Sequence, residues 1–110
     1  SELSDTITSS VGSGISFTYG DGSHDHQGCT MPVSGKVIAL TVSSASSGVG
    51  VLELHKSDVA TGIKVDLVGN YGIEYCNYSF NAGDRLHIEM KTYTSGTVTS
   101  PIAIFFVKFD

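Results

Sequence analysis

The densest group of metal-binding side chains is His24-Asp25-His26, within the glycine-punctuated polar segment 20–28. In extended backbone, residues two apart point to the same side, so both imidazoles would project together. One chain supplies too few nitrogens for a transition metal, but three copies around a threefold axis would supply an octahedral set. We predict one divalent ion (iron, nickel or zinc) per trimer. The alternative is two solvated loop histidines beside Asp21 and Asp25.

The other two histidines, His55 and His87, are predicted to lie on strand faces opposite their leucine neighbours, at the surface or an interface. Neither belongs to a recognisable catalytic motif. The sequence has no Gly-x-Ser-x-Gly elbow, no Ser-x-x-Lys and no phosphate-binding loop. We therefore expect the chain not to be an enzyme.

Tyrosines and asparagines concentrate in the second half of the chain, near predicted turns. Aromatic rings stack on sugar faces and amides bind hydroxyl groups, so exposed Tyr/Asn loops suit a glycan or protein receptor. The predicted receptor-binding residues are Asn70, Tyr71, Tyr93 and Thr94. Tyr75 and Tyr78 are predicted to lie in mid-strand. There they are at least as suited to packing inside the sandwich or at a subunit interface as to binding a receptor.

The segment that ends the chain, residues 101–109, is predicted to be a strand with two apolar faces. Its alternate rows are Ile102, Ile104 and Phe106 on one side and Ala103, Phe105, Val107 and Phe109 on the other. A small antiparallel sheet normally keeps one face polar, so the second face must meet something else. Another copy of this chain is the simplest partner. The predicted trimer-interface residues are Ile102, Ile104, Phe105, Phe106, Val107 and Phe109. We expect the row that ends in Lys108 to face the core.

The remaining elements are all predicted to be strands, because no apolar helix-period stripe of useful length occurs. The expected strands are 15–19, 36–42, 50–56, 63–68, 73–80, 85–91 and the terminal segment, with loops or turns at 43–48, 60–62, 69–72, 81–84 and 92–100. About seven or eight strands at spacings near 10 residues are typical of an antiparallel β-sandwich. We expect residues 1–28 to be a linker segment with a first strand and the His-x-His loop, and residues 29–110 to be the sandwich.

Composition narrows the class of partner. At 110 residues the chain is one domain, and its net charge of -5 with scattered basic residues argues against nucleic acid or an anionic membrane. No apolar run is long enough for membrane insertion. Because the sequence begins with Ser1, we expect it to be a piece of a longer chain. Cys29 and Cys76 permit a disulfide but do not require one.

Three segments resemble the C-terminal head domains of bacteriophage tail fibres. They are residues 31–40 (MPVSGKVIAL), residues 80–86 (FNAGDRL) and the apolar terminal strand. Such heads are similar to the jelly rolls of complement C1q and tumour necrosis factor, which assemble as trimers. His-x-His pairs also resemble the axial metal sites of trimeric phage fibres and spikes.

The resemblance implies a homotrimer at a tail-fibre tip on the virion, made in the host cytoplasm, that binds a polysaccharide or an outer-membrane protein of a bacterium. Two alternatives share the fold. One is a C1q-like or lectin-like binding module of a cellular protein, and the other is a structural fibre-trimerisation or capsid decoration domain.

Overall fold

The computed structural model describes residues 4–11, 17–19, 29–96 and 102–110. Within these residues every regular element is a β-strand and every pairing is antiparallel. The strands are β1 (Ser4–Val11), β2 (Phe17–Tyr19), β3 (Cys29–Thr30), β4 (Gly35–Lys56), β5 (Val59–Phe80), β6 (Arg85–Gly96) and β7 (Ile102–Phe109). No helix in the described ranges is long and apolar enough to cross a membrane. The predicted all-β class is confirmed.

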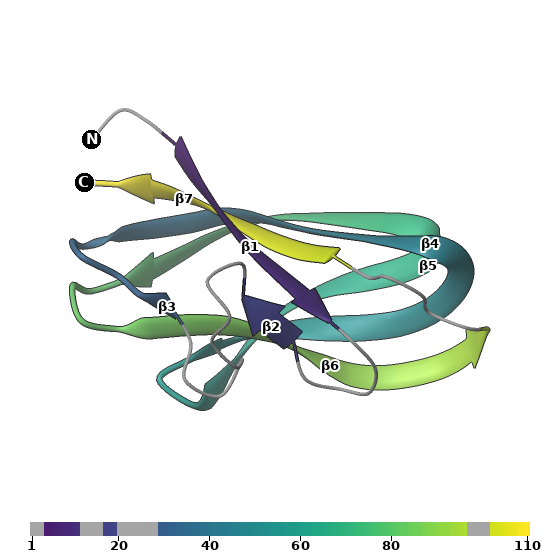
Figure 1. Ribbon diagram of the computed structural model, residues 1–110. Helices are drawn as coiled ribbons and strands as arrows, with labels where there is room; N and C mark the ends of the chain where they lie inside the picture. The colour runs from purple at the N-terminus through teal and green to yellow at the C-terminus, as the bar shows by residue number, and fades with distance from the viewer. Residues whose placement is uncertain (1–3, 12–16, 20–28, 97–101) are drawn as a thin grey trace.

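A long hairpin, β4 with β5, organises the fold. Residues 35–43 of β4 pair with residues 71–80 of β5 and with β7, whereas residues 48–56 pair with residues 59–69 of β5 and with β6. Because β4 changes neighbours in its middle, the sheet folds over on itself, and Figure 1 shows the hairpin curving from one layer to the other.

We call the two layers by their strands. The β7 layer contains β2, β1, β7 and the halves of β4 and β5 that lie beside them. The β6 layer contains β3, β6 and the other halves of β4 and β5. This arrangement is the predicted β-sandwich.

The bend of the hairpin explains two errors in the prediction. Residues 43–48 and 69–72 were expected to be loops, but both remain within strands and form the corner. Small residues permit that corner: a Cβ on Gly72 would collide with the carbonyl oxygen of Asp66. Glycine and serine favour both loops and sharp strand bends, so composition does not separate the two.

The hairpin turn lies at Ser57–Asp58 rather than at the expected residues 60–62. Both turn residues have positive φ, 49° and 69°, as two-residue hairpins of type I′ require. Strand β6 also runs to Gly96, through part of the expected 92–100 loop. The predicted turn at 81–84 is confirmed, and its Asp84 carboxylate accepts a hydrogen bond from the Asn81 amide at 2.8 Å.

The core lies between the two layers. The inward residues alternate as predicted along residues 63–68, where Val65 and Leu67 are buried and Lys64 and Asp66 are exposed. The fully buried cluster consists of Met31, Val37, Leu40, Val42, Leu52, Leu54, Val65, Leu67, Phe80, Leu86, Ile88, Ala103, Phe105 and Val107. Strand β1, within the expected linker, pairs with β7 from Ser4 to Ser10. The division of the chain at residue 28 stays a prediction.

Candidate functional site

The outer face of the β7 layer carries apolar side chains in the open. Ile73 is 52% exposed, Tyr75 is 78% exposed and Ile102 is 40% exposed. These residues come from β5 and β7, which lie on either side of β4. Side chains that face each other across a ladder point to the same side, so the three strands form one continuous apolar surface.

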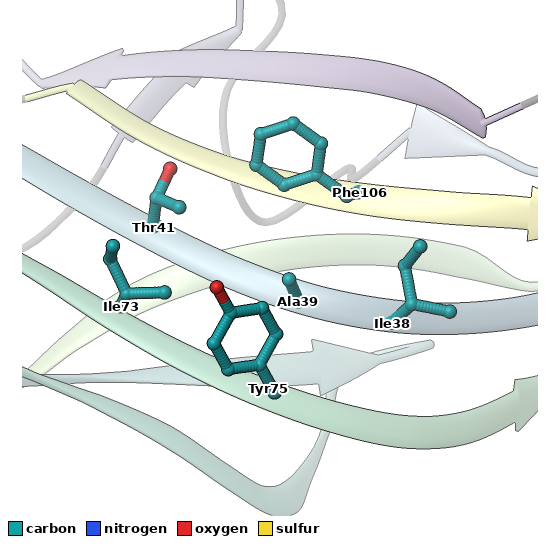
Figure 2. Close-up of a pocket in the computed structure, with 6 residues that line it drawn as sticks. All are labelled: Ile38, Ala39, Thr41, Ile73, Tyr75 and Phe106. Carbon is teal, nitrogen blue, oxygen red and sulfur yellow. The ribbon is translucent and has the colours of Figure 1, made fainter.

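A hollow of about 320 Å³ lies in the middle of this surface. Figure 2 shows its lining, which consists of Ile38, Ala39 and Thr41 from β4, Ile73 and Tyr75 from β5, and Phe106 from β7. Ala39 lies directly opposite both Tyr75 and Phe106 in the two ladders. Its small side chain between two aromatic rings forms the floor of the hollow. We refer to these six residues together with Ile102 and Ile104 as the outer apolar face.

The terminal strand is oriented the other way round from the prediction. Its core-facing row is Ala103, Phe105 and Val107, each 0% exposed, and not the row that ends in Lys108. Phe105 and Val107, expected at a subunit interface, are therefore enclosed in the core. Ile102, Ile104 and Phe106 face outward, exposed or half-buried.

Phe109 lies between these two environments. It is half-buried, and its ring meets that of Phe80 edge-on at 6.2 Å between centroids. Lys36 and Lys108 are directly opposite each other at this end of the outer apolar face, and both are exposed. The apolar surface therefore ends in a polar rim.

The predicted receptor-binding residues lie on strands that meet at the corner of the hairpin. Gly48 of β4 pairs with Gly69 of β5 on one side and with Gly96 of β6 on the other. Asn70 and Tyr71 follow the first of these partners, and the Asn70 amide donates a hydrogen bond to the Ser44 carbonyl at 3.1 Å. Tyr71 is 67% exposed.

Tyr93 and Thr94 lie in β6 and not in the expected loop. Tyr93 is opposite Gly50 in the ladder, two residues from Gly48. The backbone thus brings both predicted receptor-binding segments to the same end of the sandwich. The predicted metal ligands, His24 and His26, lie outside the described residues.

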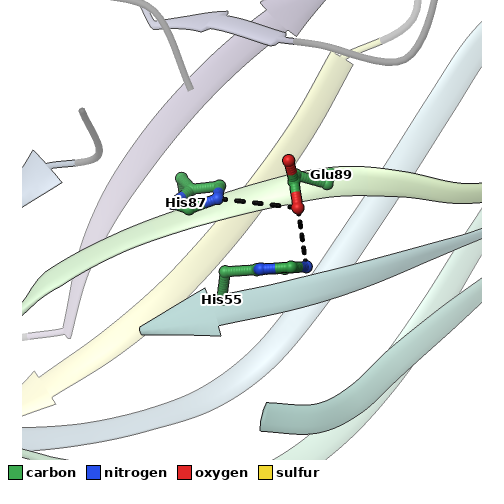
Figure 3. A group of neighbouring side chains, drawn as sticks. All are labelled: His55, His87 and Glu89. Carbon is green, nitrogen blue, oxygen red and sulfur yellow. Dashed lines mark ion pairs between the residues drawn. The ribbon is translucent and has the colours of Figure 1, made fainter. Parts of the chain in front are cut away.

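The two remaining histidines come together on the outer face of the β6 layer. His55 of β4 and His87 of β6 are directly opposite in the ladder, and their rings stack at 4.9 Å between centroids. Both Nε2 atoms approach Oε2 of Glu89, at 2.8 Å from His55 and 3.8 Å from His87, as Figure 3 shows.

We call these residues the His–His–Glu cluster. The sequence correctly places both histidines on the face opposite their leucine neighbours, but His87 is 1% exposed and therefore buried, not at the surface as expected. It does not reveal the cluster, because only the register between β4 and β6 joins residues so far apart along the chain.

Cys29 and Cys76 are both in the reduced form, and both are half-buried against the core cluster. The Cys76 thiol donates a hydrogen bond to the Val37 carbonyl at 3.3 Å. Burial, and secondarily the negative charge of Glu74, raise the pKa of Cys76 above its ordinary value. This thiol is therefore a poor nucleophile at neutral pH.

Comparison with known proteins identifies the fold but no family. No family model and no curated protein matches the sequence. The globular domain of the zebrafish complement 1qA protein matches with a TM-score of 0.50 and 14% identity, over 94% of this chain and 95% of that one. A family 35 carbohydrate-binding module from Clostridium thermocellum matches with a TM-score of 0.50 and 11% identity, over 98% and 92%.

A third match is the carbohydrate-binding module CBM36 in complex with calcium and xylotriose. Its TM-score is 0.42 at 18% identity, over 96% of this chain and 73% of that one. The two matches at 0.50 confirm the C1q-like β-sandwich at the level of fold.

Proposed function

We propose that this chain is a non-catalytic binding domain that assembles as a homotrimer through its outer apolar face. The observation that carries the proposal is the exposure of Ile73, Tyr75 and Ile102 on one continuous surface of three adjacent strands. Soluble monomers rarely expose large contiguous apolar patches, and such patches mark interaction surfaces. Another copy of the chain provides a matching apolar surface without a second kind of partner.

The fold supports the same proposal. A C1q-like sandwich whose apolar face ends in the exposed pair Lys36 and Lys108 suits side-by-side packing of identical subunits. The corner of each hairpin would then be presented at one end of the assembly, where Tyr71 is exposed. Three weak sites carried on one rigid assembly convert modest contacts into firm attachment through avidity.

We place the assembly at the tip of a bacteriophage tail fibre, on the virion, with a polysaccharide or outer-membrane protein of the bacterial host as its receptor. The setting rests on the resemblance of residues 31–40 and 80–86 to tail-fibre heads. The receptor chemistry rests on the exposed tyrosine and neighbouring amide at the hairpin corner, since aromatic rings and amides recognise sugars and polar protein surfaces.

Light scattering during size-exclusion chromatography tests the assembly. The wild-type chain is expected to elute as a trimer and Tyr75→Asp as a monomer, because the substitution introduces charge at a largely exposed position of the apolar face. Val68→Asp is the matched control, since Val68 is 67% exposed but lies on the β6 layer. A monomeric wild type, or a trimer unaffected by Tyr75→Asp, would refute the assembly.

Binding of labelled trimer to bacterial cells tests the receptor role. Tyr71→Ala is expected to weaken cell binding. Light scattering must show that this variant is still a trimer, because Tyr71 lies opposite Ser43 in the same outward row as Ile73 and Tyr75. A trimer that binds no cells would instead be a structural trimerisation domain. Binding to soluble glycans without binding to bacteria would favour a lectin-like module of a cellular protein.

A further inference from the structure

The His–His–Glu cluster has the donor atoms of a transition-metal site within a single chain. The candidate ligand atoms of His55, His87 and Glu89 all lie within 4.8 Å of one another. They come from two adjacent strands whose ladder places the histidines opposite each other. The sheet therefore already holds the three ligands together. Binding an ion there would require little additional ordering of the backbone.

The distances suit one small ion. Atoms bound tetrahedrally to zinc at about 2.1 Å are about 3.4 Å apart. The observed separations from Glu89 Oε2, 2.8 Å to His55 and 3.8 Å to His87, lie on either side of that value. Small side-chain rotations would therefore bring all three atoms to bonding distance of a common centre.

The three side chains of the His–His–Glu cluster differ in their exposed fraction. The His87 side chain is 2% exposed, that of His55 is 16% exposed and that of Glu89 is 24% exposed. The cluster opens into a hollow of about 280 Å³, which Asp58 also lines. An ion there would be shielded on one side and would keep a coordination position directed to the hollow.

Of the nearby carboxylates, Glu89 is the one that contacts the histidines, whereas Glu53 and Asp58 contact other groups. Glu53, opposite Glu89 in the ladder, accepts a hydrogen bond from the Gly62 amide at 3.0 Å and lies 3.4 Å from Lys91 Nζ. Asp58 pairs with Arg85 at 2.9 Å.

We propose that His55 Nε2, His87 Nε2 and a Glu89 carboxylate oxygen bind one divalent transition-metal ion per chain, with zinc as the best fit. Two imidazoles and one carboxylate form a donor set that zinc takes in three-ligand sites with an open fourth position. Calcium and magnesium prefer sets made entirely of oxygen and are not expected to compete. The ion would join β4 to β6 on the outer side of the sandwich. This site needs no assembly, so it goes beyond the proposed function and differs from the predicted axial His24/His26 site.

Titration of the full chain with Zn²⁺ after removal of metals by a chelator tests the proposal. Calorimetry is expected to give one ion per chain, and Co²⁺ in its place is expected to give the visible absorption of a nitrogen- and oxygen-ligated ion. Zinc is also expected to raise the melting temperature, because the unfolded chain lacks the assembled site. Magnesium and calcium should neither bind at one ion per chain nor raise the melting temperature.

Two single variants locate the site. His55→Ala and the isosteric Glu89→Gln are each expected to weaken zinc binding by a factor of about ten or more. Glu89→Gln keeps the shape of the side chain, so it gives a reading even if His55→Ala folds poorly. Glu74→Gln removes the same charge from an exposed position in the half of β5 that belongs to the β7 layer and should bind zinc as the wild type does.

The remaining outcomes separate this site from the others. His24→Ala/His26→Ala and the monomeric Tyr75→Asp should both retain one zinc ion per chain. Zinc bound at one ion per three chains and lost only in the His24/His26 variant would overturn the proposal. So would an affinity unchanged by both His55→Ala and Glu89→Gln, or the absence of zinc binding by the wild type.

Discussion

At the residue scale, the position of Cys76 at the edge of the core makes its thiol harder to ionise. Its thiol is half-buried and donates to the Val37 carbonyl, and its pKa is raised first by burial and then by Glu74. The folded chain therefore holds the proton at a pH where the unfolded chain has released it. This contribution to stability is complete below the ordinary thiol pKa and is lost as the pH rises through the raised value.

The expected result is that the free energy of unfolding falls more steeply above about pH 8.5 in the wild type than in Cys76→Ser. A serine hydroxyl can donate the same hydrogen bond but does not ionise in this range. Urea unfolding at pH 7, 8, 9 and 10 measures the difference, and the other titrating groups are common to both proteins. Parallel pH curves would show that burial does not perturb this thiol.

At the scale of elements, the corner of the β4–β5 hairpin decides whether the sheet can fold into two layers. Gly72 lies where a Cβ would overlap the Asp66 carbonyl group, which is backbone and cannot move aside alone. Gly72→Ala is expected to cost about 3 kcal/mol of unfolding free energy. Gly83→Ala is the control, because Gly83 has a φ of 91° but open space around it, and about 1 kcal/mol is expected. Urea unfolding that ranks Gly83→Ala as the more damaging change would contradict this account of the corner.

The same elements show which features the sequence predicts and why it does not predict the others. Alternation identified Val65 and Leu67 as inward-facing because each strand reports its own buried face. It failed at residues 43–48, since small residues suit a bend within a strand as well as a loop. It also gave the wrong core-facing row for β7, because both rows are apolar and only the packing of the layers distinguishes them. The His–His–Glu cluster depends on the register between two strands, which no local pattern encodes.

At the scale of the whole molecule, stability and assembly should be coupled through the outer apolar face. If that face buries about 300 Å² per chain, the gain is on the order of 7 kcal/mol before the costs of ordering are subtracted. Partner subunits bind the folded chain and not the unfolded one, so mass action favours the folded state as concentration rises. The melting temperature of the wild type is therefore expected to increase with protein concentration.

Differential scanning calorimetry over a hundredfold range of concentration measures this coupling. Tyr75→Asp should melt at a temperature independent of concentration, because its monomer has no partner to lose. Val68→Asp should follow the wild type, since Val68, 67% exposed against 78% for Tyr75, lies on the β6 layer. Zinc, if bound within each chain, should raise all three melting temperatures by a similar amount without changing their dependence on protein concentration. If the wild-type melting temperature does not depend on protein concentration, then the exposed Tyr75 and Ile73 do not form a contact between chains.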